Sequence, residues 1–317
     1  MTQALRIATR GSALALVQAR QVQAGLAARG IESELVTYTT TGDRQLDRPL
    51  AAIGAKGLFT AELERDLVAG RVDCCVHSLK DLPTTSPEGT AIVAHLERDD
   101  PRDALVLAPG VAATDVASLP HGAVVGTSSL RRRAQLLALR PDLRVVELRG
   151  NVPTRVRKVD EGQVQAAILA AAGLRRLDLA QRIACVLDAP AWLAAAGQGA
   201  IAVQARADDA RVMTMLAALD HARTTRDVTA ERAFLAALEG GCQVPIGAAI
   251  AHDESGDVLH GFVSDLAGRH VVRGARVLGE QPAETGRALA DELRAAGADG
   301  VLAAVRPDSP YPAPQPE

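Results

Sequence analysis

The sequence lacks the features that mark several large classes of protein. No apolar run approaches the roughly 20 residues of a membrane-spanning helix, and the first residues lack the charged and apolar regions of a signal peptide. The 35 Lys and Arg residues nearly balance the 38 Asp and Glu residues, and the net charge of -3 gives no overall field to attract nucleic acid or an anionic membrane. We therefore expect a cytoplasmic protein that binds neither.

Metal-binding and phosphate-binding signatures are also missing. The four cysteines show no C-x-x-C spacing, so neither a structural zinc site nor a disulfide framework is expected, and we predict no metal. There is no G-x-x-x-x-G-K-[ST] loop and no G-x-G-x-x-G fingerprint, and Gly197-Gln198-Gly199 alone is too short to indicate a nucleotide site.

The cysteines that are present differ in their surroundings. Cys74 and Cys75 lie in an apolar run that is typical of a buried strand, where free cysteine usually packs as a small hydrophobe. Cys242 instead follows Gly240-Gly241 and precedes Pro245, at a turn between a helix and a strand. That loop would present a thiol, although the local residues alone also allow a spectator thiol.

The pattern of apolar residues predicts two α/β lobes. The first third alternates strands and helices, and a second run of the same kind begins after residue 103, as in sheets covered by helices on both faces. Residues 200–204 form a short strand that could return to the first lobe. We expect strands at 5–9, 31–37, 72–76, 104–107, 123–125, 145–148 and 166–169, and helices at 13–28 and 60–68.

The pattern changes after about residue 221. One helix, the cysteine loop, strands separated by turn residues and a helix near 283–295 predict an antiparallel sheet with helices on one face. The proline-rich residues 306–317 are expected to be a disordered tail.

Arginines gather where a ligand would bind such lobes, beyond the carboxyl ends of strands. Arg131 and Arg132 stand in the first turn of a predicted helix, where positive charge opposes the helix dipole unless an anion compensates it. Arg10 and Arg149 each follow a strand, and Arg155 comes soon after Arg149. Several such arginines suggest a ligand with many carboxylates, whereas each one alone could belong to a solvated face.

Asp81 follows the buried strand at 72–76 and places a carboxylate at the same kind of edge. It is the candidate for acid–base chemistry or for stabilising a positive charge. Taken alone, an aspartate before a proline is more often a turn former. Lys80 could pair with Asp81 or meet a carboxylate of the ligand.

Together these motifs closely resemble the hydroxymethylbilane synthase family, also called porphobilinogen deaminases. The motifs that carry the resemblance span almost the whole chain in order: residues 6–12 (RIATRGS), 56–59 (KGLF), 77–83 (HSLKDLP), 99–103 (DDPRD), 126–132 (GTSSLRR), 149–152 (RGNV), 197–200 (GQGA) and 239–245 (EGGCQVP).

The resemblance implies a fold and a reaction. The fold is α/β, with two lobes like those of periplasmic binding proteins, built on mixed or parallel sheets, and a C-terminal α+β domain with an antiparallel sheet. The expected domains are residues 1–98 with 198–218, residues 99–197, and residues 219–305. The implied enzyme is a monomeric transferase of tetrapyrrole and heme biosynthesis that joins four porphobilinogens head to tail, with loss of ammonia, on a covalent dipyrromethane cofactor and releases linear hydroxymethylbilane.

The resemblance also assigns roles to residues. Asp81 is implied as the catalytic carboxylate, and Cys242 as the thioether attachment point of the dipyrromethane. The cofactor is expected to bind Lys80, Asp81, Ser128, Ser129, Arg131, Arg132 and Arg155. The substrate and growing chain are expected to bind Arg10, Ser12, Gln18, Arg149, Arg155, Arg176 and Gln198. Lys56 and Phe59 fall in an expected lid, where many relatives have a second lysine in place of Ala52.

Two other functions would each explain part of this pattern. A non-catalytic two-lobed protein that binds an organic anion would explain the arginines but not Cys242 or a third domain. A thiol hydrolase with Cys242 as nucleophile needs a partner histidine, and the nearest in sequence, His252 and His260, lie in strand-like segments without a matching motif.

Overall fold

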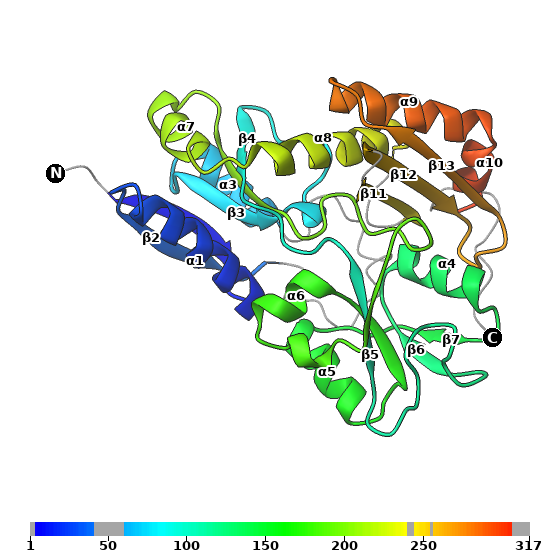
Figure 1. Ribbon diagram of the computed structural model, residues 1–317. Coiled ribbons are helices and arrows are strands. Elements are labelled where there is room, and N and C mark those ends of the chain that lie inside the picture. The colour runs from blue at the N-terminus through cyan, green and yellow to red at the C-terminus, as the bar shows by residue number, and fades with distance from the viewer. Residues whose placement is uncertain (1–3, 41–59, 240–243, 254–255, 306–317) are drawn as a thin grey trace. The chain divides into compact units, whose positions relative to one another are not determined.

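The computed structural model describes residues 4–40, 60–239, 244–253 and 256–305 (Figure 1). Residues 1–100 with 197–226 form one compact unit, and residues 101–196 with 227–317 form a second. Within the described ranges, no helix is long and apolar enough to cross a membrane.

The first unit contains a five-stranded sheet in the order β2-β1-β3-β10-β4. β1 runs parallel to both β2 and β3, whereas β10 is antiparallel to β3 and β4. The strands are β1 (Leu5–Arg10), β2 (Ser33–Tyr38), β3 (Cys74–Ser78), β4 (Thr90–His95) and β10 (Ile201–Arg206). The prediction that the strand near residue 200 returns to the first lobe is confirmed, and its antiparallel direction makes the sheet mixed.

Helices pack on this sheet because their apolar residues recur at helical spacing. They are α1 (Ala13–Ala27), α3 (Ala61–Val68) and α7 (Ala210–Ala217), and a short 3₁₀ helix, η2 (Leu79–Asp81), follows β3. α1 buries Ala19, Val22 and Leu26 against one face of the sheet. Leu63 and Leu67 of α3 belong to a separate apolar cluster with Cys75 and Val72.

The second unit repeats the sheet design in the order β7-β6-β8-β5-β9. β6 is parallel to β7 and β8, and β5 is antiparallel to β8 and β9, so β5 takes the position that β10 has in the first sheet. The strands are β5 (Asp103–Leu107), β6 (Val124–Gly126), β7 (Arg144–Val146), β8 (Ala166–Ala170) and β9 (Cys185–Leu187). The helices are α4 (Leu130–Leu139), α5 (Val152–Asp160) and α6 (Ala171–Arg176), with a 3₁₀ turn, η3 (Ala180–Arg182), before β9.

The second unit also contains the predicted antiparallel sheet, in the order β11-β12-β13. Helices lie along one face of this sheet (Figure 1), where Phe234, Leu259, Val263 and Leu289 form a buried cluster. The opposite face packs Phe262 against Leu193. The elements are α8 (Ala222–Ala237), β11 (Ile246–Asp253), β12 (Gly256–Ser264), β13 (Val271–Val277), α9 (Pro282–Ala295) and α10 (Ala298–Ala303). The predicted fold class, two α/β lobes and a C-terminal α+β part, is therefore confirmed.

Candidate active site

Asp81 ends η2, directly beyond the carboxyl end of β3. Among the described residues, its carboxylate has no hydrogen-bond or ion-pair partner, and Lys80 does not pair with it. A turn-forming aspartate accepts hydrogen bonds from the backbone beside it, and Asp81 accepts none. Its carboxylate is thus held at a sheet edge without a structural role in the turn.

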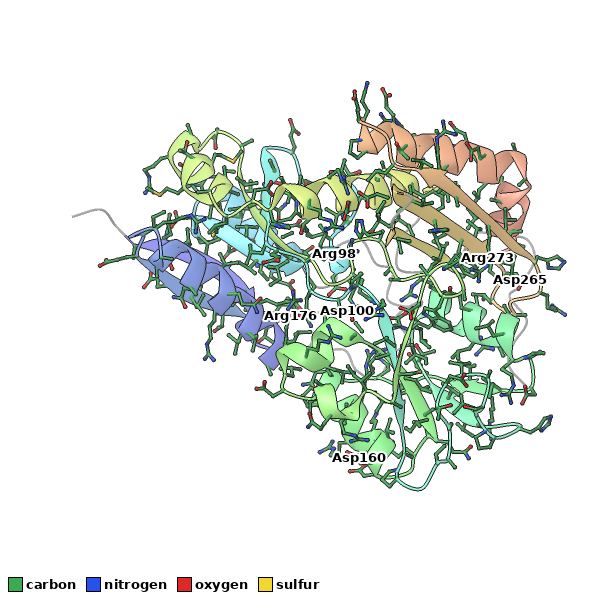
Figure 2. The ribbon with its side chains drawn as sticks, viewed as in Figure 1. Arg98, Asp100, Asp160, Arg176, Asp265 and Arg273 are labelled. Atoms are coloured by element: carbon green, nitrogen blue, oxygen red, sulfur yellow. The ribbon has the colours of Figure 1, made fainter. Side chains whose placement is uncertain are left out.

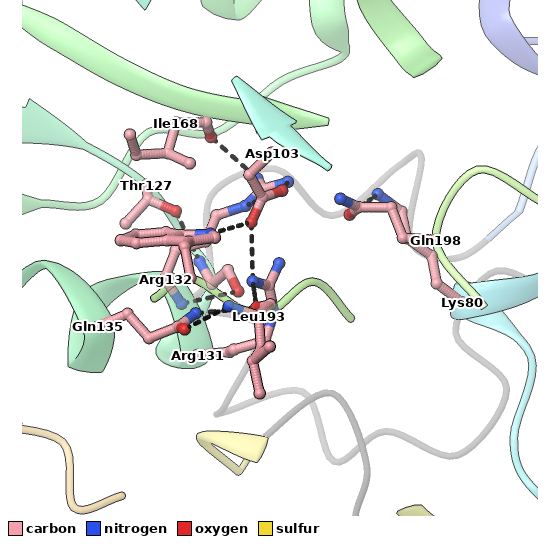
Figure 3. Close-up of polar contacts among 11 residues, drawn as sticks. Lys80, Asp103, Thr127, Arg131, Arg132, Gln135, Ile168, Leu193 and Gln198 are labelled. Atoms are coloured by element: carbon pink, nitrogen blue, oxygen red, sulfur yellow. Dashed lines mark hydrogen bonds and ion pairs between the residues drawn. The ribbon is translucent and has the colours of Figure 1, made fainter. Parts of the chain in front are cut away.

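Lys80 is held from another part of the first unit. Its Nζ donates to Oε1 of Gln198 at 3.2 Å (Figure 3), and Gln198 is only 1% exposed. Gly197 and Gly199 have φ values of +74° and +86°, a region that favours glycine. A Cβ on Gly197 would lie 2.8 Å from Leu79 Cγ, so the backbone must approach η2 this closely to present Gln198.

Three further predicted residues of the first unit lie at the ends of its strands or on α1. Ser12 is the N-cap of α1, and its hydroxyl accepts from the backbone N–H of Ala15 at 3.3 Å. Gln18 is buried and exchanges hydrogen bonds with the Ser78 hydroxyl, with Nε2–Oγ and Oγ–Oε1 distances of 2.8 and 3.0 Å. Arg10 ends β1. Ser12 thus has a capping role, and Gln18 links α1 to the last residue of β3.

In the second unit, Arg131 and Arg132 share one buried carboxylate, that of Asp103 (Figure 3). Arg131 Nη1 donates to Oδ2 at 2.7 Å, and Arg132 donates to Oδ1 through Nε at 3.1 Å and Nη2 at 2.7 Å. Trp192 Nε1 also donates to Oδ2, at 2.8 Å. The solvated-face interpretation of these two arginines is wrong, because Arg131 is 5% and Arg132 is 6% exposed.

The cluster retains positive charge. Two guanidinium groups and one carboxylate leave one net positive charge, at the N-terminal turn of α4, where the helix dipole is also positive. Burial raises the pKa of the Asp103 carboxyl, but the charges of Arg131 and Arg132 outweigh it and hold that pKa well below its usual range. Burial lowers the pKa of Arg131, and the Asp103 carboxylate opposes this effect. The carboxylate is therefore ionised at neutral pH.

Arg131 also keeps hydrogen-bond donors for a ligand. Its Nη1 donates to Asp103 and to the main-chain oxygen of Leu193 at 2.6 Å, whereas Nε and Nη2 have no partner among the described residues. Arg132 is more fully engaged, since its Nη1 donates to the main-chain oxygen of Ile168 at 2.9 Å. A buried guanidinium with unused N–H groups and net positive surroundings fits a carboxylate ligand.

Two predicted serines begin α4 next to this cluster. The Ser129 hydroxyl caps the helix by accepting from the backbone N–H of Arg132 at 3.4 Å. The Ser128 hydroxyl donates to the main-chain oxygen of Leu148 at 2.8 Å. Both side chains therefore order the strand-to-helix turn, and a hydroxyl that donates one hydrogen bond can still accept others.

The other predicted arginines of this unit lie on neighbouring segments. Arg149 Nε is 3.9 Å from Glu147 Oε1, and Arg155 Nε donates to the main-chain oxygen of Gly150 at 2.7 Å. Arg176, labelled in Figure 2, ends α6 directly after β8. Arg149 and Arg155 follow strand β7, as the sequence predicted, and Arg176 follows β8.

The structure describes Cys74 and Cys75 but not Cys242. Cys242, Lys56, Phe59 and Ala52 lie outside the described residues. Cys74 is fully buried, and burial raises the pKa of its thiol to about 12. Burial likewise raises the pKa of the Cys75 thiol well above its ordinary value. Neither is a reactive thiolate at neutral pH, which agrees with the predicted core role.

Sequence reasoning missed the roles of Asp103 and Trp192. In the sequence, Asp103 ends the acidic motif at 99–103, and Trp192 is the only tryptophan of the chain. Asp103 lies 28 positions from Arg131 and 89 positions from Trp192 in the sequence. The available signal was charge balance, because two adjacent arginines at a helix start require a nearby anion.

One of the two candidate histidines for a thiol hydrolase, His252, is held between carboxylates. His252 Nε2 lies 2.9 Å from Asp227 Oδ2, and Nδ1 lies 2.5 Å from Asp257 Oδ1. Because both ring nitrogens face carboxylates, His252 has no nitrogen left to activate a thiol. Among the residues that the structure describes, no group of three or more His, Cys, Asp or Glu residues could hold a metal ion.

Comparison with known proteins identifies the family. Residues 5–214 match the family model described as porphobilinogen deaminase, dipyromethane cofactor binding domain, and residues 225–295 match porphobilinogen deaminase, C-terminal domain. A porphobilinogen deaminase of Roseiflexus castenholzii is 50% identical over 306 residues, covering 96% of this chain and 100% of the relative. One from Nitratidesulfovibrio vulgaris is 48% identical over 311 residues, covering 95% and 96%.

Among solved structures, the methionine binding protein MetQ is similar over 70% of this chain and 90% of its own, with 14% identity and a TM-score of 0.43. The two matched family models together cover most of the sequence, and the relatives are aligned over nearly their full length. The chain therefore belongs to the porphobilinogen deaminase family.

Proposed function

We propose that this chain is a hydroxymethylbilane synthase. It is a transferase that condenses four porphobilinogen units head to tail with loss of ammonia and releases linear hydroxymethylbilane by hydrolysis. Its place is in tetrapyrrole and heme biosynthesis, and its dipyrromethane cofactor is joined to the Cys242 sulfur through a thioether. Membership of the family, with both of its domains matched, supports this assignment.

One observation supports the cofactor site most strongly. Arg131 is buried, belongs to a cluster with one net positive charge, and keeps Nε and Nη2 unused by the described residues. Carboxylates satisfy such planar donors well. When bound, the dipyrromethane supplies the pyrrole carbon on which the chain grows. The residues proposed to hold its carboxylates and ring N–H groups are Lys80, Asp81, Ser128, Ser129, Arg131, Arg132 and Arg155.

Asp81 is the proposed catalytic residue. Loss of ammonia from porphobilinogen leaves an electron-poor azafulvene, and the carbon–carbon bond forms with positive charge on pyrrole nitrogen. A carboxylate without a competing partner can stabilise that charge and carry the proton that is released when the pyrrole regains its aromaticity. Asp81 has this availability, because no described residue donates to it.

The remaining cationic and polar residues are proposed to bind the carboxylate arms of substrate and of the elongating chain. Each pyrrole unit carries an acetate and a propionate arm, so every condensation adds two carboxylates that need donors. These residues are Arg10, Ser12, Gln18, Arg149, Arg155, Arg176 and Gln198. We also propose a cytoplasmic monomer that binds neither nucleic acid nor membrane, with three domains at residues 1–98 with 198–218, 99–197 and 219–305.

The direct test supplies purified protein with porphobilinogen and measures ammonia and product together. We expect four ammonia molecules released for each linear tetrapyrrole formed, and no product from the Asp81→Ala variant. Binding of porphobilinogen without release of ammonia would favour the alternative, a non-catalytic two-lobed binding protein.

A further inference from the structure

The arginine pair of α4 is oriented by two residues to which no role in the reaction has been assigned. Asp103, the first residue of β5, is fully buried and divides its oxygens between the two guanidinium groups. Oδ2 accepts from Arg131 and Oδ1 accepts twice from Arg132, at 2.7–3.1 Å. Two adjacent cations that would repel each other are therefore held apart on one carboxylate.

Trp192 fixes that carboxylate. Its Nε1 donates to Oδ2 at 2.8 Å, and the indole is only 3% exposed. The next residue, Leu193, accepts from Arg131 Nη1 through its main-chain oxygen at 2.6 Å. Gln135 donates to the same oxygen at 2.9 Å and accepts from the Leu193 N–H at 2.7 Å. Both hydrogens of Arg131 Nη1 are thus engaged, which fixes the direction of Nε and Nη2.

The same short segment also contacts the C-terminal sheet. The main-chain oxygen of Ala194 accepts from the Ala248 N–H of β11 at 3.0 Å. A Cβ built on Gly247 would lie 3.1 Å from Leu193 Cβ, so the two backbones pass at close range. Residues 192–194 therefore connect the arginine pair of α4 with β11 inside the second unit.

We infer that Asp103 and Trp192 are positioning residues for cofactor binding, which hold the Arg131–Arg132 pair at one net positive charge and aim the unused N–H groups of Arg131 at the anion. This inference rests on the proposed function, in which Arg131 and Arg132 bind carboxylates of the dipyrromethane. Neither positioning residue needs to touch the cofactor, because each acts through the guanidinium groups.

The test measures how fast the full-length apoprotein gains the dipyrromethane mass when porphobilinogen is supplied. Trp192→Phe keeps an aromatic ring and removes only the Nε1–H donor, whereas Asp103→Asn removes the negative charge. Asp142→Asn is the matched control, because Asp142 accepts from Arg140 Nε and Nη2 at 2.7 and 2.8 Å at the other end of α4. Thermal unfolding followed by circular dichroism gives the folded fraction of each variant.

We expect both positioning variants to load about tenfold more slowly than the parent per folded chain, since hydrogen bonds to charged groups carry such effects. Asp142→Asn should load at the parental rate. If the loading rate of Trp192→Phe falls only in proportion to its folded fraction, the Trp192 hydrogen bond supports the fold alone. That result would overturn the inference. Because Asp103→Asn leaves buried arginines uncompensated and can unfold the chain, Trp192→Phe is the deciding variant.

The Arg131→Leu variant tests the proposed cofactor site separately from the positioning inference. If Arg131→Leu fails to load while Trp192→Phe loads at the parental rate, the positioning inference is overturned and the cofactor site stands. If Arg131→Leu also loads normally, the proposed cofactor site itself is wrong, and the inference falls with it.

Discussion

Replacing Asp81 by Asn isolates the chemistry of one carboxylate from its structural cost. Among the described residues, no group donates to the Asp81 side chain, so the substitution breaks no hydrogen bond or ion pair. The free energy of unfolding should change by no more than about 0.5 kcal/mol, as at ordinary surface positions. The amide occupies nearly the same volume but carries no negative charge and cannot take up a proton.

The expected loss is therefore kinetic. Removing one preorganised group that stabilises developing charge costs about 2.7–4 kcal/mol, which corresponds to a fall in kcat of about 10²–10³-fold. Release of ammonia from porphobilinogen under saturating substrate gives kcat, and thermal unfolding gives stability. Glu88→Gln is the control, because Glu88 is exposed in the same unit and its change also removes one carboxylate.

The Asp81→Asn variant tests the fold and the chemistry separately. A large drop in the unfolding midpoint would mean that the Asp81 carboxylate supports the fold. An unchanged kcat at unchanged stability would refute the catalytic role and return Asp81 to an ordinary loop position. Either conclusion requires that Glu88→Gln keep the kcat and stability of the parent protein. That result would show that the change in net charge alone does not cause the effect.

Three further changes test other parts of the account. Gly199→Ala should lower stability and activity more than Gly70→Ala does. Both glycines have a positive φ, but only at Gly199 would the added Cβ lie 2.5 Å from a main-chain oxygen. Equal melting points of the two variants would contradict the close approach. Burial lowers the pKa of His77 to about 4 from 6.5, so the free energy of unfolding should fall as the pH drops from 6.5 towards 4, where the unfolded chain takes up a proton and the folded chain does not. Urea titrations should show that this fall is up to about 3 kcal/mol smaller in His77→Gln. An equal fall in both proteins would refute the shift. Arg149→Leu should still acquire the cofactor but accumulate bound intermediates or bind substrate poorly, visible by intact mass after substrate addition, whereas normal turnover would remove Arg149 from the substrate site.

Local patterns predicted most elements but not their long-range pairing. Short apolar runs bounded by turn residues marked β1 and β8, and the predicted helix at 13–28 matches α1, because these signals depend on neighbouring residues. The direction of β10 depends instead on its pairing with β3 and β4, more than 100 positions earlier. A single sequence carries no local signal for such pairing.

The candidate site shows the same division. Asp81 and the arginines were predicted from their positions after strands, where sheets bind ligands. The contact between Lys80 and Gln198 joins residues 118 positions apart, and the sharing of Asp103 by Arg131 and Arg132 requires β5 to lie beside α4. These pairings arise from tertiary packing, so residue type and spacing indicated a need for an anion without identifying which residue supplies it.

The mass of the intact protein shows whether Cys242 carries a covalent dipyrromethane. The active parent protein should be heavier than its 317-residue sequence by one dipyrromethane, and Cys242→Ser should lose both this mass and turnover. Cys74→Ala and Cys75→Ala should keep the added mass, because these thiols are buried and protonated. An active parent protein with the mass of the bare chain, or an added mass that persists in Cys242→Ser, would contradict the account.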